Sequence, residues 1–100
     1  MTTIKERLAR GEEVRVMVMG GLASPKLAEV VGVMGGFHGL WVDQEHSAVP
    51  HQQLELIMMA CRAAGLDAFA RVAPTDYGAV MRPMEAGAGG VMVAQIRTVE

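Results

Sequence analysis

The sequence has few aromatic side chains, one cysteine and no long apolar run. The first shortage limits what can form a core, and the other two exclude classes of protein. Aromatic residues make up 4% of the chain, so aliphatic side chains and nine methionines must fill any core. Cys61 is the only cysteine, which excludes an intrachain disulfide and fits a reducing compartment. No apolar run approaches the roughly 20 residues that span a bilayer, and residues 1–10 are too polar for a signal peptide. We therefore expect a soluble, cytoplasmic protein with no membrane partner.

An excess of positive charge is also missing. Nine basic and eleven acidic residues give a net charge of −2, and the basic residues form no stripe along the chain. Nucleic-acid binding depends on concentrated positive charge, so we expect no nucleic-acid partner. Hydrophobic residues make up 51% of the 100 residues, which is typical of one small globular domain.

What the sequence does contain is an alternation of β-rich runs and helical patterns. After a short helix opened by a capping-box pattern at Thr3–Glu6, the predicted strands are 14–19, 40–43, 68–72 and 90–94. The predicted helices between them are 25–34, 51–64 and 76–86, with Gly or Pro at most junctions. In the last of these, one stripe is predicted to face the core: Tyr77, Val80, Met81 and Met84. This alternation predicts right-handed βαβ units, a parallel sheet and the α/β fold class.

The number of strands indicates part of a larger barrel. A (β/α)8 TIM barrel needs roughly 250 residues, and this chain supplies about four strands and three helices of it. We expect residues 1–100 to form the N-terminal half of a single, truncated TIM-barrel domain. A complete four-stranded doubly wound domain, of the flavodoxin-like kind that binds small ligands, is the alternative.

Charged side chains follow two neighbouring predicted strands. Asp43, Glu45 and His46 come directly after the second strand, and Arg71 interrupts the apolar third strand. The carboxyl ends of parallel strands meet at one rim, where α/β proteins bind ligands. Histidine exchanges protons near neutral pH, so His46 is a candidate base. A buried arginine requires an anion, so Arg71 implies either a substrate carboxylate or a protein acid, of which Asp43, Glu45 and Glu85 are candidates.

The sequence lacks the residues that Schiff-base catalysis and a zinc cluster require. Lys5 and Lys26 lie outside the strands, so a Schiff-base mechanism has no nucleophile. Cys61 lies on the apolar stripe of a helix, and no spacing of cysteine and histidine fits a zinc cluster. After the fourth strand, Gln95 and Arg97 are either part of the rim or solvated surface residues.

The motifs together resemble the HpcH/HpaI aldolase family of metal-dependent, class II pyruvate aldolases, which includes 2-keto-3-deoxy sugar acid aldolases. The matching segments are Gly-Leu-Ala-Ser-Pro at 21–25, Asp-Gln-Glu-His at 43–46, Ala-Arg-Val at 70–72 and Met-Glu-Ala-Gly-Ala-Gly-Gly-Val at 84–91. The resemblance implies a TIM barrel and a carbon–carbon lyase. Such an enzyme cleaves 4-hydroxy-2-oxo acids to pyruvate, or a related 2-oxo acid, and an aldehyde.

The resemblance also implies a role for each matching residue. His46 matches the catalytic base, and Arg71 matches the arginine that binds the substrate and stabilises the developing enolate. Glu85 stands where the family usually has an aspartate that raises the basicity of the histidine. Asp43 matches an acid that organises the site. Met19 stands where several relatives have a tryptophan in the substrate pocket.

The cofactor implied by the resemblance is a divalent metal, Mg, Mn or Co. Its ligands in the family are a glutamate and an aspartate from later strands, so we expect no metal ligand in this chain, Glu45 included. The complete enzyme is expected to be a homo-oligomer whose partner is a small 2-oxo acid, and the 100-residue chain alone is expected to be inactive. The alternative is a non-catalytic half-barrel that acts only by association with another chain.

Overall fold

The computed structural model describes residues 1–47 and 49–99, and it contains four strands and four helices. In chain order they are α1 (Ile4–Ala9), β1 (Val16–Met19), α2 (Pro25–Met34), β2 (Gly39–Asp43), α3 (His51–Ala63), β3 (Asp67–Val72), α4 (Tyr77–Glu85) and β4 (Gly90–Val93). No helix of the described residues is long and apolar enough to cross a bilayer.

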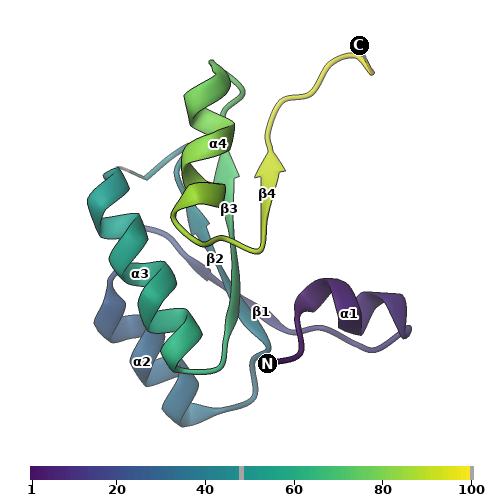
Figure 1. Cartoon of the computed structure of the whole chain (residues 1–100), viewed down its shortest axis with the longest axis vertical. Coiled ribbons are helices and arrows are strands. Elements are labelled where there is room, and N and C mark those ends of the chain that lie inside the picture. The colour runs from purple at the N-terminus through teal and green to yellow at the C-terminus, as the bar shows by residue number, and fades with distance from the viewer. Residues whose placement is uncertain (48, 100) are drawn as a thin grey trace.

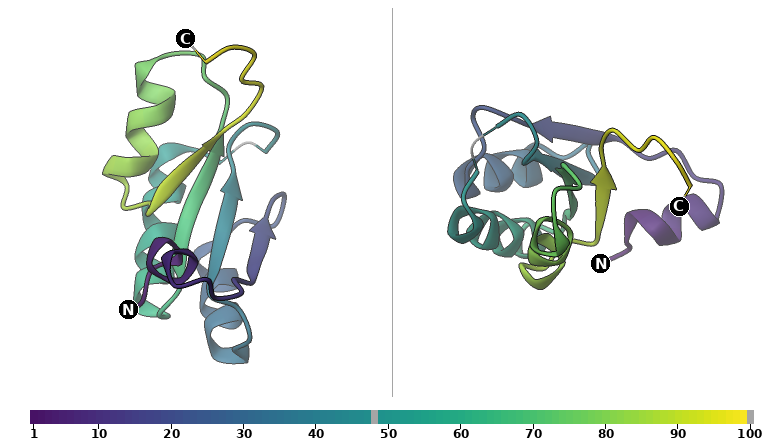
Figure 2. Two further views of the ribbon diagram at one scale, coloured as in Figure 1. Left: turned by 90° about the vertical axis from the view of Figure 1, so that its right-hand side faces the viewer. Right: turned by 90° about the horizontal axis from the view of Figure 1, so that it is seen from above.

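The four strands form one parallel sheet in the order β1-β2-β3-β4, which is also their order along the chain (Figure 1). Helices α2, α3 and α4 cover one face of this sheet, and α1 lies on the other side, near the amino ends of the strands (Figure 2). Sequential parallel strands joined by helices on a single face are the arrangement of a TIM barrel. The predicted fold class is confirmed, because the chain has the architecture of the first half of such a barrel.

Local sequence signals set the ends of the first two helices. Thr3 and Glu6 form the predicted capping box, in which each side chain accepts the backbone N–H of the other residue at 3.1 Å. The Ser24 hydroxyl accepts the N–H of Leu27 at 3.1 Å, and Pro25 occupies the first turn of α2. These contacts satisfy N–H groups that have no partner inside a helix, as the sequence predicted.

The core lies between the sheet and the helices. Leu40 and Val42 point from β2 toward Leu54 and Ile57 on α3, and all four side chains are fully buried. Alternation along each strand sends every second side chain into this layer. The other side chains, such as Trp41 and Phe69, therefore occupy the sheet face that these helices do not cover.

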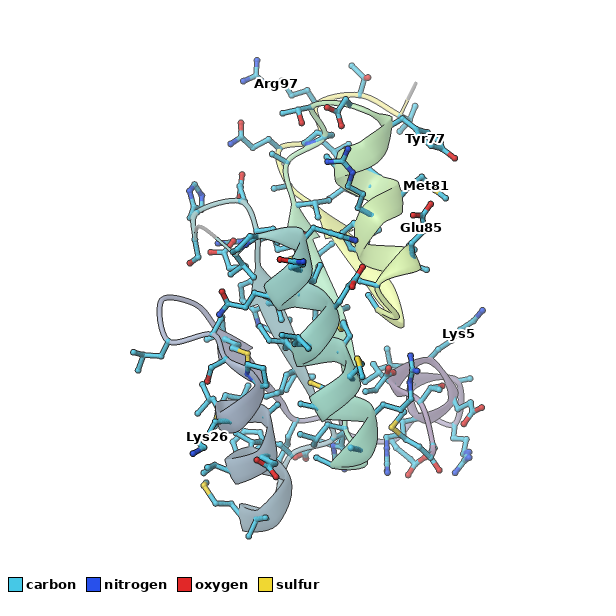
Figure 3. The ribbon with its side chains drawn as sticks, turned by 60° about the vertical axis from the view of Figure 1, so that its left-hand side comes forward. Lys5, Lys26, Tyr77, Met81, Glu85 and Arg97 are labelled. Atoms are coloured by element: carbon cyan, nitrogen blue, oxygen red, sulfur yellow. The ribbon has the colours of Figure 1, made fainter. Side chains whose placement is uncertain are left out.

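The structure corrects the predicted core stripe of α4. Tyr77 and Met84 are 78% and 43% exposed, and the residue that α4 buries is Pro83. Figure 3 shows Tyr77 and Met81 along the outer side of the helix. The helix ends the row α2-α3-α4, so only one of its flanks has a helical neighbour. The apolar spacing was correct for a helix, but it did not show which side faces the sheet.

Candidate functional site

Asp43 and Arg71 form a two-point ion pair at the carboxyl end of the sheet. They are register partners on β2 and β3. Arg71 Nε donates to Asp43 Oδ1 at 3.2 Å, and Arg71 Nη2 donates to Asp43 Oδ2 at 2.7 Å. A planar guanidinium fits both oxygens of a carboxylate in this way. The anion that the sequence required for Arg71 is therefore supplied by the protein itself.

This pairing keeps both groups charged. The hydrogen bonds from Arg71 lower the pKa of Asp43 from 3.8 to about 2, with smaller contributions from the backbone N–H groups of His46 and Glu45. Burial of the carboxyl group acts in the opposite direction, but the hydrogen bonds outweigh it. The pKa of Arg71 is raised, chiefly by its hydrogen bond to Asp43.

Asp43 also shapes the loop that follows β2. Its Oδ1 accepts the backbone N–H of Glu45 at 2.9 Å and that of His46 at 3.1 Å. An aspartate that bonds to the backbone two or three residues ahead closes a tight turn. One carboxylate thus anchors Arg71 and sets the direction in which Glu45 and His46 leave the strand. This geometry fits the organising role expected for Asp43.

Glu45 is the residue on which the site converges. Its side chain is only 7% exposed. Oε1 lies 3.2 Å from His46 Nε2 and 3.5 Å from Arg71 Nε. Oε2 accepts a hydrogen bond from the side-chain amide of Gln95 at 3.1 Å. His46 and Arg71 therefore flank the same carboxylate oxygen, and the His46 side chain remains 66% exposed to solvent.

Two aromatic rings lie next to this cluster, and one of them contacts Arg71. The guanidinium carbon of Arg71 lies 4.9 Å from the centroid of the Trp41 ring. Trp41 in turn stacks on Phe69, with ring centroids 6.3 Å apart and planes 9° apart. The contact between the cation and the indole ring stabilises Arg71 and limits the directions its side chain can take. No sequence motif marks Trp41 as a site residue, although strand alternation places it on the same face as Asp43 and Arg71.

The structure does not bring Glu85 to this site. Glu85 is the exposed last residue of α4, and Figure 3 shows its side chain pointing outward. Because α4 returns the chain to the amino ends of the strands, its last turn lies at the opposite end of the sheet from His46. Within residues 1–47 and 49–99, the acid beside His46 is Glu45. The interpretation of Glu85 as the partner of His46 is therefore not supported by this chain's geometry.

Met19 is also not at the surface of the site. Its side chain is 1% exposed and packs in the core between sheet and helices. Its neighbour Val18, which is 51% exposed, points to the open face instead. The motif match located the strand end correctly, but the alternation of side chains turns Met19 away from any substrate on the open face.

Gln95 belongs to the site, whereas Arg97 lies apart from it. The sequence left both residues open, and the hydrogen bond from Gln95 to Glu45 now places Gln95 at the rim. Figure 3 shows the side chain of Arg97 extending away from the body of the molecule. The only sequence signal for Gln95 was its place just after a strand, which does not reveal the partner 50 residues earlier.

The described part of the chain does not form a metal site by itself. Among residues 1–47 and 49–99, no three histidine, cysteine, aspartate or glutamate side chains are grouped so that they could hold a metal ion. The two carboxylates at the rim, Asp43 and Glu45, already contact Arg71. The sequence prediction that this chain supplies no metal ligand stays a prediction.

Solved structures match nearly the whole length of the chain. The citrate synthase SbnG matches 96% of this chain with a TM-score of 0.86 and 24% identity, over 38% of its own length. A variant of the same enzyme matches 91% of this chain with a TM-score of 0.77 and 25% identity, over 37% of its length. The HpcH/HpaI aldolase from Desulfitobacterium hafniense DCB-2 matches 91% with a TM-score of 0.82 and 22% identity, over 35% of its length.

No family model and no curated protein matches the sequence. The chain spans less than two fifths of each of the three solved chains, so the likeness concerns the part of the barrel that carries the rim described above. It confirms at the level of fold the resemblance drawn from the motifs: this chain has the fold of the first part of an HpcH/HpaI aldolase barrel.

Proposed function

We propose that this chain supplies the base and the guanidinium of a carbon–carbon lyase site. The site would cleave 4-hydroxy-2-oxo acids to pyruvate, or a related 2-oxo acid, and an aldehyde. The observation that carries the proposal is that His46 and Arg71, from two different strand ends, flank one oxygen of Glu45. An imidazole beside a guanidinium on an open rim provides a base and a positive charge for the same small anion.

In this reaction His46 takes the proton of the substrate hydroxyl group. The carbon–carbon bond then breaks, the hydroxyl carbon becomes the aldehyde, and the electron pair of the bond forms the enolate of the 2-oxo acid. Arg71 stabilises the negative charge that develops on the enolate oxygen. The protonated His46 returns the proton to the enolate carbon, directly or through water, which releases the 2-oxo acid and restores the base.

The net charge at the rim is consistent with a need for additional positive charge. Asp43 and Glu45 place two negative charges around the single positive charge of Arg71, with distances of 2.7 Å and 3.5 Å to its nitrogens. This cluster carries an excess negative charge, so it does not by itself favour a further anion. A divalent metal, when bound, supplies positive charge to an enolate. The residues described here do not form its site, and the requirement for Mg, Mn or Co rests on the family resemblance.

The single tryptophan offers a direct test of substrate binding, because Arg71 lies on its ring. In a preparation that releases pyruvate from a 4-hydroxy-2-oxo acid, pyruvate added with Mg²⁺ or Mn²⁺ is expected to change the fluorescence of Trp41 and to saturate. Arg71→Met should remove this response, since the guanidinium proposed to bind the carboxylate of pyruvate is gone. Arg15→Met is the matched control, because Arg15 directly precedes β1, at the amino end of the sheet, and should leave the response unchanged. An equal response in wild type and Arg71→Met would contradict the proposal.

His46 is tested by turnover. In a preparation that releases pyruvate from a 4-hydroxy-2-oxo acid, His46→Ala is expected to lower kcat by at least about a hundredfold, as for the loss of a general base. Binding of pyruvate should survive, because Arg71 remains. Unchanged turnover would remove His46 from the mechanism.

The second candidate function is association without catalysis. The sheet face opposite α2, α3 and α4 carries partly exposed apolar side chains, with Val18 51% and Met92 40% exposed. All-parallel sheets are normally covered on both faces. A half-barrel of this kind would act by joining another chain along its open face and its two free sheet edges.

A further inference from the structure

Gln95 stands out for its backbone. The chain follows the sheet as far as Ala94, whose N–H donates to Val72 O at 2.9 Å, and then turns at Gln95 with φ of 56°. Among the described residues, Gln95 is the only one other than glycine with a positive φ. Such a backbone is unfavourable for a residue with a Cβ, and it persists where surrounding contacts hold it in place.

The contact that this turn permits is the one to Glu45. Turning at Gln95 brings its side-chain amide past the end of β3 to the loop after β2, where Nε2 donates to Glu45 Oε2 at 3.1 Å. With Oε2 occupied, the other oxygen, Oε1, is the one that faces His46 and Arg71. A carboxylate without this donor can rotate and offer both oxygens to the guanidinium, since arginine favours a two-point contact.

The orientation of Glu45 determines where His46 carries its hydrogen. A carboxylate oxygen only accepts hydrogen bonds, so an imidazole whose Nε2 lies 3.2 Å from Oε1 is favoured when that nitrogen carries the hydrogen. In a neutral imidazole the other nitrogen then has the lone pair. In that tautomer the nitrogen able to act as a base is Nδ1, in a side chain that is 66% exposed.

We propose that Gln95 is a positioning residue: its amide holds the Glu45 carboxylate so that one oxygen binds His46 Nε2, which leaves Nδ1 of His46 as the proton acceptor. Gln95 does not touch the reacting atoms and acts through Glu45. The assignment of Nδ1 as the catalytic nitrogen rests on the proposed function, but the position of the hydrogen on the ring does not.

The test is nitrogen NMR of the 100-residue chain labelled with ¹⁵N at histidine, recorded where the imidazoles are neutral. The wild type is expected to show the Nε2–H tautomer of His46 almost alone. Gln95→Gly removes the amide and also suits the positive φ, so the fold is retained. It should raise the share of the Nδ1–H tautomer about fivefold, the population change produced by one ordinary hydrogen bond.

Two further variants make the result specific. Gln95→Glu places a second carboxylate against Glu45 and should raise the Nδ1–H share at least as much, because like charges repel. Arg97→Gly removes a side chain of the same segment that extends away from the site, and it should leave the tautomer unchanged. A wild-type tautomer ratio in Gln95→Gly, at an unchanged melting temperature, would overturn the proposal.

Turnover gives an independent second measurement. In a preparation that releases pyruvate, Gln95→Gly should lower kcat about fivefold with KM unchanged, because substrate binding by Arg71 is not touched. If the wild type neither binds nor releases pyruvate, the lyase proposal fails while the tautomer result still decides the role of Gln95. A shift in KM with kcat unchanged would instead assign Gln95 to substrate binding and contradict a positioning role.

Discussion

At the scale of single residues, Asp43 organises the rim through its hydrogen bonds. Its two oxygens hold Arg71, and one of them also accepts two backbone N–H groups of the following loop. The sequence predicted that Asp43, His46 and Arg71 would meet, because parallel strands end at the same rim. It could not show that Glu45 stands between His46 and Arg71, since that depends on side-chain rotamers and on Gln95 from a distant strand.

The lowered pKa of Asp43 predicts how stability depends on pH. A carboxyl group with a pKa of about 2 in the folded state and 3.8 as its ordinary value stabilises the fold fully above that ordinary value. This contribution is lost as the pH falls from about 4 to about 2, because the unfolded chain binds the proton first. The free energy of unfolding, measured with urea across this range, should fall more steeply in the wild type than in Asp43→Asn.

Glu13 provides the matched control for this measurement. It forms an ion pair with Arg15 at 2.8 Å, but both side chains are more than 60% exposed. Exposed pairs contribute little to stability. Glu13→Gln should therefore keep the wild-type slope, and an equal slope in Asp43→Asn would show that the Arg71 pair is not formed in solution.

At the scale of elements, the close approach of α2 and α3 depends on one glycine. A Cβ placed on Gly32 would lie 2.6 Å from the Cβ of Ala64 and 3.1 Å from its carbonyl oxygen. The obstacle is largely backbone, which cannot move aside without shifting a helix. We expect Gly32→Ala to lower the free energy of unfolding by about 1–3 kcal/mol, the usual cost of overpacking, despite the better helix propensity of alanine.

Gly21→Ala is the control for this substitution. Nothing lies within 4 Å of a Cβ at Gly21, and its φ is not in the left-handed region. Its unfolding midpoint in urea should stay within error of the wild type. If Gly32→Ala proved as stable as Gly21→Ala, Gly32 would not lie as close to Ala64 as the structure shows.

The elements also show where sequence patterns succeed and where they fail. Capping residues and glycines placed the helices and strands within about two residues, because these signals act locally. The burial of Met19 and the outward position of Tyr77 and Met84 depend on which side of an element meets the sheet. Glu85 was assigned by its place in a motif, although the end of α4 lies at the amino ends of the strands.

At the scale of the whole chain, α2, α3 and α4 cover one face of the sheet, and within residues 1–47 and 49–99 only the short α1 lies on the other face, near the amino ends of the strands. The open face presents Val18 and Met92, and each outer strand has a free edge. We expect the 100-residue chain to associate in solution, so light scattering should give a mass above that of one 10.7 kDa chain. Val18→Lys should reduce this mass, since a charge on the face opposes its burial. A well-behaved wild-type monomer would contradict the association.

The proposed lyase site requires one small 2-oxo acid to contact both His46 and Arg71. The test is an NMR titration with pyruvate and Mg²⁺, in a preparation that releases pyruvate from a 4-hydroxy-2-oxo acid, that follows the side-chain signals of His46 and Arg71. Both signals are expected to move together, with one saturation midpoint, while the signals of Arg15, at the amino end of the sheet, stay in place. A titration that moved neither signal, or moved one with a midpoint of its own, would contradict a shared site at the rim.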